Sequence, residues 1–176
     1  MKKVFYIMMT MSLAAAMTGC GEKEQKFNYL LDEFADLKIM RYQIPGWDEL
    51  SLQQKEYAYH LAEAAKWGRD IIWDQNSEHN IELRHTIENI LENYEGDKSS
   101  DEYQKFLVYA KRVFFANGIH HHYAEDKFFP ECSQEYFKSL MQAVGDADKC
   151  DLLIPYIYSK DNYKQRRANA TTGDIV

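Results

Sequence analysis

Apolar side chains recur every three or four residues in several separate stretches of this chain, a spacing that places them on one face of an α-helix. The pattern predicts helices over residues 27–37, 51–67, 83–94, 103–117 and 133–144. Residues 38–45 lose the helical period and are expected to be extended. Pro45-Gly46 is expected to end this segment with a turn. The chain is therefore predicted to be mainly α, an irregular multi-helix domain with long ordered loops.

Residues that favour helix ends stand at several of these boundaries. Gly68 is expected to mark a kink or a cap after the second helix. Pro155 interrupts the apolar run that begins at Leu152, so no closing helix is predicted there. The other candidate caps are the capping box Ser51 with Gln54, the C-terminal cap Asn117 with Gly118, and the N-cap Ser133.

Aromatic residues make up 14% of the chain and are expected to stack its helices together. The tryptophans Trp47, Trp67 and Trp73 are predicted to be core anchors, because large aromatic side chains normally bury. The helix over 51–67 is expected to contribute core material through its small and apolar side chains. These are Leu52, Leu61, Ala62, Ala64 and Ala65.

The first residues have the features of a bacterial lipoprotein signal peptide. Lys2 and Lys3 precede an apolar run, and Met17-Thr-Gly-Cys20 is a lipobox-like cleavage site. Residues 1–19 are therefore predicted to be removed, Cys20 to carry the lipid, and residues 20–26 to form a polar tether to a domain over 27–176. The expected location is exported and membrane-anchored, on the periplasmic or cell-surface side.

The net charge bears on which partners the protein can bind, and the cysteine content bears on disulfide and zinc sites. Removal of residues 1–19 takes away Lys2 and Lys3 and no acidic residue, so the net charge changes from −7 to −9. Such a surface repels phosphate backbones, and nucleic acid is not an expected partner. Cys132 and Cys150 lack zinc-site spacing, and the sequence leaves open whether they form a disulfide or stay as two free thiols.

Three neighbouring histidines stand in the stretch over 117–130, the histidine loop, which is predicted to connect two helices. In an extended conformation His120 and His122 would share one face and His121 would point away. A metal would need further ligands that the loop lacks, so no metal is predicted here. A role in substrate contact or loop ordering and a purely structural role remain equally open. The neighbouring residues favour loop ordering, with Asp126 and Lys127 bonding across the loop above buried Phe128 and Phe129.

Two histidine-glutamate pairs stand at helical spacing, and each pair could place two ligands on one metal ion. Glu82 with His85, and Glu56 with His60, each supply one pair where a carboxylate-bridged metal site needs several. Both are expected to lie on solvated helix faces, and the chain is predicted to hold no metal. No Ser-His-Asp set, phosphate loop or His-Glu-x-x-His zinc helix occurs in the sequence.

A polar run surrounds Ile71, Ile72 and Trp73. Arg69 is expected to pair with Asp70 or Asp74, while Asn76 is expected to satisfy a loop carbonyl. The alternative for Asn76, contact with a peptide main chain, cannot be chosen from spacing alone.

Three segments together resemble one enzyme family: Arg41-Tyr-Gln-Ile-Pro-Gly-Trp-Asp-Glu-Leu-Ser-Leu-Gln-Gln-Lys55, Trp67-Gly-Arg-Asp-Ile-Ile-Trp-Asp-Gln-Asn76 and the histidine loop. They are similar to the N-terminal region of the dipeptidyl peptidase III family of zinc exopeptidases, in its bacterial lipoprotein branch. The resemblance covers nearly everything after Cys20. It implies a larger two-lobed enzyme that releases dipeptides from the N-termini of oligopeptides.

The family holds its zinc with a His-Glu-x-x-Gly-His helix and a later glutamate, and neither motif is in this sequence. The resemblance therefore implies an N-terminal fragment that is inactive alone and binds no zinc. It also implies that the histidine loop lies near the substrate cleft, which makes His120, His121, His122 and Tyr123 candidates for contact with an oligopeptide substrate. The alternative is a complete, non-enzymatic lipoprotein that binds a peptide or protein partner through this loop.

Overall fold

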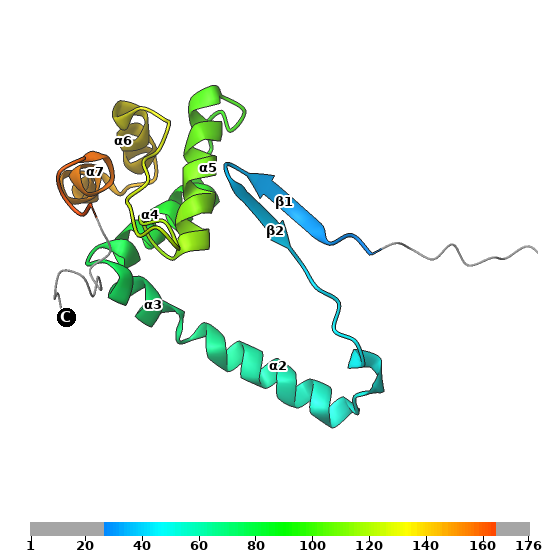
Figure 1. Cartoon of the computed structure of the whole chain (residues 1–176). Helices are drawn as coiled ribbons and strands as arrows, with labels where there is room; N and C mark the ends of the chain where they lie inside the picture. The colour runs from blue at the N-terminus through cyan, green and yellow to red at the C-terminus, as the bar shows by residue number, and fades with distance from the viewer. Residues whose placement is uncertain (1–26, 165–176) are drawn as a thin grey trace, which may run out of the picture. The chain divides into compact units, whose positions relative to one another are not determined.

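The computed structural model describes residues 27–164, and it is mainly helical, as predicted (Figure 1). The described residues divide into two compact units, one formed by residues 27–33 and 38–43 and the other by residues 34–37 and 44–164. The predicted signal peptide, the lipidation site Cys20 and the whole predicted tether lie outside the described residues. Over residues 27–164, no helix has the length and apolar character needed to cross a bilayer.

The region over 27–40 is a β-hairpin, so the helix predicted over 27–37 is wrong. Strands β1 (Leu30–Phe34) and β2 (Leu37–Met40) pair in a two-stranded sheet. The turn between them places Ala35 in the left-handed region at φ 49°. Leu30 and Phe34 are four residues apart, a spacing that fits one face of a helix and one face of a strand equally well, and the pairing of the two strands decides between them. The extended segment expected from residue 38 is confirmed as far as Met40.

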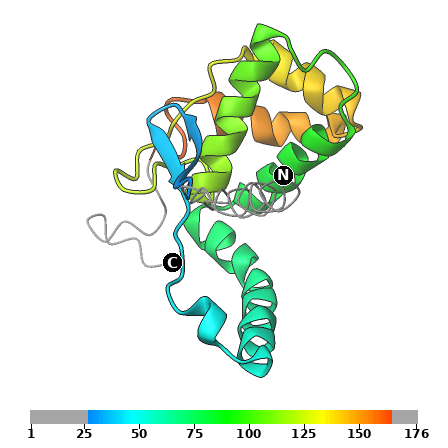
Figure 2. The ribbon, with the colours of Figure 1, turned by 90° about the vertical axis from the view of Figure 1, so that its right-hand side faces the viewer.

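The second unit contains the packed helices α3 to α7, which follow the short helix η1 and α2 along the chain. Its core is built around α4, which contacts α3, α5 and α6, while α6 also contacts α7 (Figure 2). The elements are η1 (Trp47–Glu49), α2 (Leu52–Lys66), α3 (Arg69–Asn76), α4 (Asn80–Asn93), α5 (Asp101–Ala116), α6 (Gln134–Ala143), η2 (Ala147–Lys149) and α7 (Cys150–Tyr158). The largest fully buried side chains are Trp73, Tyr109, Tyr156, Phe106 and Phe137.

Most predicted helix ends are confirmed. Ser51 forms a capping box with Gln54, and Ser133 caps α6 by accepting a hydrogen bond from the Tyr136 backbone N–H. Asn117 ends α5 in the left-handed conformation, at φ 54°. The chain also breaks at Gly68, between α2 and α3.

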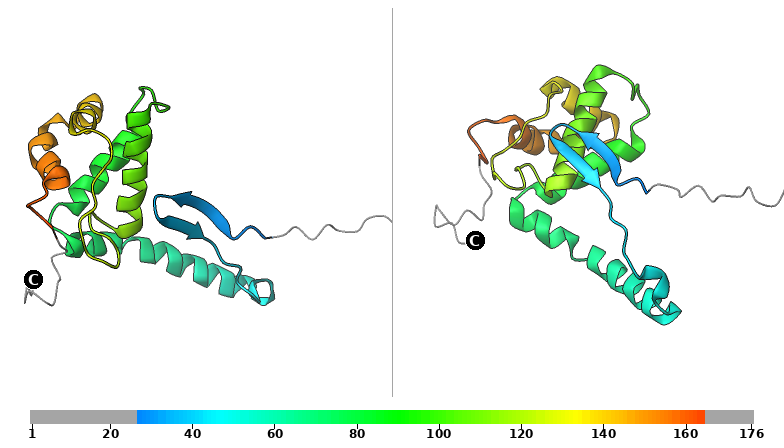
Figure 3. Two further views of the ribbon diagram at one scale, coloured as in Figure 1. Left: turned by 45° about the horizontal axis from the view of Figure 1, so that its top comes forward. Right: turned by 45° about the vertical axis from the view of Figure 1, so that its right-hand side comes forward.

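Helix α2 contributes nothing to the core, contrary to the prediction. It contains no buried residue, and Figure 3 shows it continuing away from α3 and the packed helices. Trp67 at its end is 89% exposed and Trp47 is 39% exposed, so only Trp73 is a core anchor. The apolar pattern of α2 correctly predicts a helix, but none of its side chains is buried.

Helix α7 forms although no closing helix was predicted. Pro155 lies inside it and removes one backbone hydrogen bond. The flanking residues Leu153, Ile154, Tyr156 and Ile157 are all buried. Their burial, at about 1.5–3 kcal/mol for each large apolar side chain, outweighs the lost hydrogen bond.

Candidate functional site

The histidine loop is fixed at its start by Asn80, a fully buried residue in the first turn of α4. The Asn80 amide oxygen accepts hydrogen bonds from the Ile119 backbone N–H (3.3 Å) and the Tyr156 hydroxyl (2.8 Å). Its amide nitrogen donates to the carbonyl oxygen of Trp73 at 3.1 Å. Gly118 lies against this amide at φ 145°, where any side chain would collide with Asn80. One side chain thus joins α3, α4, α7 and the loop.

The two limbs of the loop pair before the chain turns. His120 and Lys127 form an antiparallel bridge, and the Phe128 backbone N–H donates to the carbonyl oxygen of Ile119 at 3.1 Å. Between them the His121 N–H donates to the Asp126 carbonyl at 2.8 Å. The loop is therefore ordered by its own backbone, and Phe128 is buried beneath it, as the loop-ordering hypothesis predicted.

The predicted alternation of the three histidines is wrong. The rings of His121 and His122 lie on the same side, with centroids 4.4 Å apart. The cause is a turn that His121 itself stabilises: its Nδ1 accepts hydrogen bonds from the backbone N–H groups of Tyr123 (3.2 Å) and Ala124 (3.1 Å). Because Nδ1 accepts in this geometry, the proton of the neutral ring is on Nε2.

The outer part of the loop carries a row of aromatic rings. His122 packs edge-on against Phe115 of α5, with ring centroids 4.9 Å apart, and lies tilted against Tyr123 at 4.2 Å. Tyr123 is 86% exposed, while His121 and His122 are partly exposed. Three of the four candidate contact residues therefore face solvent together, with ring faces and hydrogen-bonding atoms that an arriving peptide could reach.

His120 lies apart from the other three candidates. Its side chain is buried, and its Nε2 donates to the main-chain carbonyl of Tyr163 at 2.8 Å. The ammonium of Lys127 also turns inward and donates to the carbonyl oxygens of Ser159 (2.8 Å) and Asn162 (3.4 Å), rather than across the loop as expected. Burial lowers the pKa of Lys127 to about 8. Phe129, expected to bury, is 37% exposed.

The turn between the two strands supplies a carboxylate to the loop within the second unit. Asp36 lies 3.7 Å from Nε2 of His121 and 3.6 Å from the guanidinium of Arg112. At 3.7 Å this carboxylate is near Nε2 of His121 but beyond hydrogen-bond distance. This arrangement could not be predicted, because Asp36 is distant from the loop along the chain.

The remaining polar candidates have structural partners. Asn76 donates to the Asn117 carbonyl at 3.0 Å, the loop-carbonyl role predicted for it. Arg69 was expected to pair with Asp70 or Asp74, but Asp70 pairs with Arg84 instead. The predicted Arg69–Asp70 ion pair is therefore wrong. Within residues 27–164 no group of three or more histidine, cysteine or acidic residues is placed to hold a metal ion. Glu82 contacts His79 at 3.2 Å instead of sharing a site with His85.

Cys132 and Cys150 are both free and buried. Burial raises the pKa of each thiol, with Tyr158 and charged neighbours acting as smaller influences. A raised pKa keeps the thiols protonated at neutral pH, and only the thiolate is a good nucleophile. Neither cysteine is therefore suited to nucleophilic catalysis.

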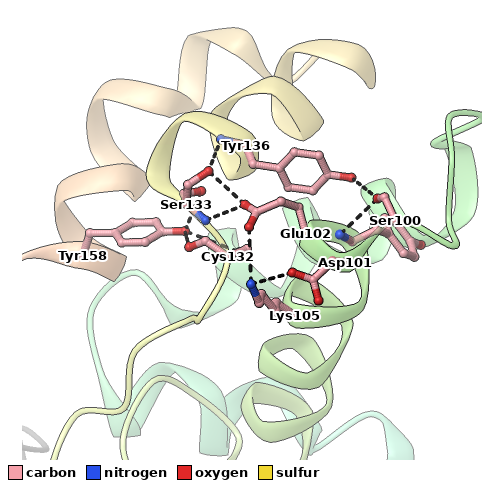
Figure 4. Close-up of polar contacts among 9 residues, drawn as sticks. Ser100, Asp101, Glu102, Lys105, Cys132, Ser133, Tyr136 and Tyr158 are labelled. Atoms are coloured by element: carbon pink, nitrogen blue, oxygen red, sulfur yellow. Dashed lines mark hydrogen bonds and ion pairs between the residues drawn. The ribbon is translucent and has the colours of Figure 1, made fainter.

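A polar cluster that the sequence did not suggest joins the N-terminal ends of α5 and α6 (Figure 4). The Glu102 carboxylate accepts from the backbone N–H of Ser133 at 2.8 Å and from its hydroxyl at 2.9 Å. Lys105 bridges Asp101 and Glu102, and the Tyr158 hydroxyl is 3.0 Å from the Cys132 carbonyl. The Ser133 N–H, followed by its hydroxyl, lowers the pKa of Glu102. All these groups satisfy one another, so the cluster serves packing.

Substitution of Ser133 by alanine is expected to lower the free energy of unfolding by about 1–2 kcal/mol, because it removes an N-cap and one donor to Glu102. Chemical denaturation measures the change. Ser139→Ala is the matched control, since Ser139 lies exposed on the same helix and only donates to the Tyr136 carbonyl. An equal effect of the Ser133 and Ser139 substitutions would contradict the capping role of Ser133.

The hydrogen bonds from Ser133 to Glu102 also make stability depend on pH. Because the folded pKa of Glu102 is lowered, the stability contributed by its carboxylate is complete above the ordinary pKa near 4.5 and is lost as the pH falls below that value.

No protein-family model matches the chain, and no curated protein matches it.

Proposed function

We propose that this chain is the N-terminal helical portion of a zinc-dependent dipeptidyl peptidase of the dipeptidyl peptidase III kind, which releases dipeptides from the N-termini of oligopeptides. In this proposal the zinc, its ligands and the glutamate base that activates the metal-bound water belong to residues beyond this sequence. The chain contributes scaffold and one wall of the substrate cleft. By the predicted lipid on Cys20, the enzyme is held at a membrane.

The exposed apolar surface of α2 and α3 is the observation that carries the proposal. Leu52 and Tyr59 lie on one side of α2 by their seven-residue spacing, and Tyr57, Leu61 and Ala65 lie on the opposite side. A helix with apolar residues on two opposite sides is typical of the interior of a larger protein. The exposed large side chains are Leu52, Tyr57, Tyr59, Leu61, Trp67, Ile71 and Ile72, which we call the α2–α3 apolar surface.

The histidine loop supports the peptide-binding part of the proposal. The His121 and His122 rings are partly exposed and Tyr123 is 86% exposed on an ordered loop. Imidazole and phenol groups can donate to the main-chain carbonyls of a peptide, and the ring faces can contact its side chains. His120 is removed from this set because it is buried.

A non-enzymatic lipoprotein that binds a peptide or protein partner would also use an exposed apolar surface. The nucleotide sequence after the codon for Val176 separates the two hypotheses. A reading frame that continues into His-Glu-x-x-Gly-His supports the peptidase. A stop codon, with the chain active in binding by itself, supports the alternative.

The purified chain is expected to bind zinc no tighter than about micromolar and to release no dipeptide from synthetic substrates, because a structural or catalytic zinc site needs at least three well-placed ligands. Isothermal titration with zinc and a dipeptidyl-naphthylamide assay measure both. The control is the longer protein that contains the zinc motif, which should cleave the same substrate. Stoichiometric tight zinc binding or turnover by the chain alone would overturn the proposal.

A further inference from the structure

Residues 159–164 lie across the inner side of the histidine loop and are held mainly through their main-chain carbonyls. Nε2 of His120 donates to the Tyr163 carbonyl at 2.8 Å, and the Lys127 backbone N–H donates to the Lys164 carbonyl at 3.1 Å. The Lys127 ammonium donates to the Ser159 and Asn162 carbonyls. His120 and Lys127 face each other across the bridge, so one face of the loop makes all these contacts.

We propose that residues 159–164 form a releasable strap, which closes over His120 and Lys127 and opens to expose the Lys127 ammonium to water. This inference does not depend on the proposed peptidase function. When the strap is open, the His120 imidazole and the Lys127 ammonium become available on the same loop as His121, His122 and Tyr123. When it is closed, the main-chain carbonyls of the strap occupy both donors.

Several features make the strap the weakly held part of this contact. Residues 160–164 are exposed, whereas Lys127 beneath them is only 8% exposed. Tyr163 adopts φ 55°, a left-handed conformation that is unfavourable for a residue with a Cβ atom. Its ring packs edge-on against Tyr156 at 4.8 Å and against His79 at 6.0 Å, which holds the strained residue in place. Opening relieves the strain at Tyr163.

The charge of Lys127 acts against closure. The titratable groups around its ammonium are His120 on the loop, Tyr156 and Tyr158 on α7, and Lys160, Asp161, Tyr163 and Lys164 on the strap, where Asp161 and Lys164 pair at 3.6 Å. The ammonium donates to the carbonyl oxygens of Ser159 and Asn162 and lies 5.3 Å from the centre of the Phe129 ring, with no carboxylate among these contacts. Its burial lowers the Lys127 pKa to about 8 from an ordinary value of 10.5. The open state therefore binds the proton more tightly than the closed state. Closure is expected to strengthen as the pH rises from about 8 towards 10 and to weaken at neutral pH.

Hydrogen exchange at single amides of the full chain, followed by NMR and corrected for intrinsic rates, tests the proposal. The Lys127 amide reports on the strap because it bonds to the Lys164 carbonyl, and the neighbouring Phe128 amide, bonded to Ile119, is the internal control. The protection factor at Lys127 is expected to rise about tenfold from pH 7 to pH 9, while that at Phe128 stays constant. Equal changes at the two amides, or no change at Lys127, would overturn the proposal.

Lys127→Met and Lys127→Gln remove the titrating group and are expected to abolish the pH-dependent rise at the 127 amide. Lys98→Gln is the matched control, because the Lys98 ammonium also donates to a backbone carbonyl, that of Leu91, but in an exposed position. It should leave the rise intact. Protection of the α5 amides in every variant verifies that the fold is retained. A rise that persists in both Lys127 variants would show that another group controls the strap.

Discussion

Asn80→Ala is expected to lower the free energy of unfolding by about 2–4 kcal/mol, because the substitution removes one hydrogen bond from each of several buried polar groups, at about 1–3 kcal/mol for a group left unsatisfied, while the Tyr156 hydroxyl keeps Ser77 and the His79 backbone as partners. The Ile119 N–H, the Tyr156 hydroxyl and the Trp73 carbonyl all lose their hydrogen bond to the Asn80 side chain. None of the three can turn to water, since Ile119, Tyr156 and Trp73 are at most 1% exposed. Denaturation in urea, followed by circular dichroism, measures the loss.

Asn93→Ala is the matched control for this prediction. Asn93 stands at the other end of the same helix, is exposed, and donates only to the Asn89 side chain. Its replacement is expected to change stability by less than about 0.5 kcal/mol. A double-mutant cycle with Tyr156→Phe should give a coupling energy of about 1 kcal/mol or more for the 2.8 Å hydrogen bond. A loss below about 1 kcal/mol for Asn80→Ala would refute its role as the residue that anchors the loop.

The anchor role of Asn80 could not be predicted, whereas the helices around it could. The apolar periods of α4, α5 and α6 and the caps Ser51, Asn117 and Ser133 depend on residues close together in the chain, and the structure confirms them. The partners of Asn80 are 7 to 76 residues away. Nothing in the local sequence indicates which buried amide meets them.

The histidine loop illustrates the same division between local and distant information. The loop itself and the burial of Phe128 follow from neighbouring residues and were predicted. The inward turn of His120 and Lys127 depends on the strap more than thirty residues later. The side-chain hydrogen bonds of His121 then form a turn where an extended strand was expected.

Periodicity also identifies the apolar face of a helix without saying what covers it. For α4 the apolar face packs against α3, α5 and α6, and its Leu83, Ile87 and Ile90 are fully buried. For α2 the same reasoning predicted core residues that are exposed in the structure. The difference between these two helices leads directly to a test of the α2–α3 apolar surface.

The isolated chain is expected to self-associate and to bind hydrophobic dyes through the α2–α3 apolar surface. Leu61 is 52% exposed and Ile71 is 59% exposed on this surface. Each such side chain contributes about 1.5–3 kcal/mol when buried, so Leu61→Asp with Ile71→Asp should weaken self-association by about a hundredfold or more. Sedimentation velocity over a concentration series and dye fluorescence measure the change.

The control for this pair adds the same two charges at comparably exposed apolar positions elsewhere. Ile44 is 67% exposed and Leu152 is 41% exposed, and both lie outside α2 and α3. Ile44→Asp with Leu152→Asp should therefore leave dye binding and self-association close to those of the unsubstituted chain, apart from a small effect of net charge. In the longer, zinc-bearing protein the first pair should also reduce peptidase activity while the control pair does not, because only the first pair lies where the remainder is proposed to pack. An unsubstituted chain that stays monomeric and dye-negative at all concentrations would remove the main support for a missing partner.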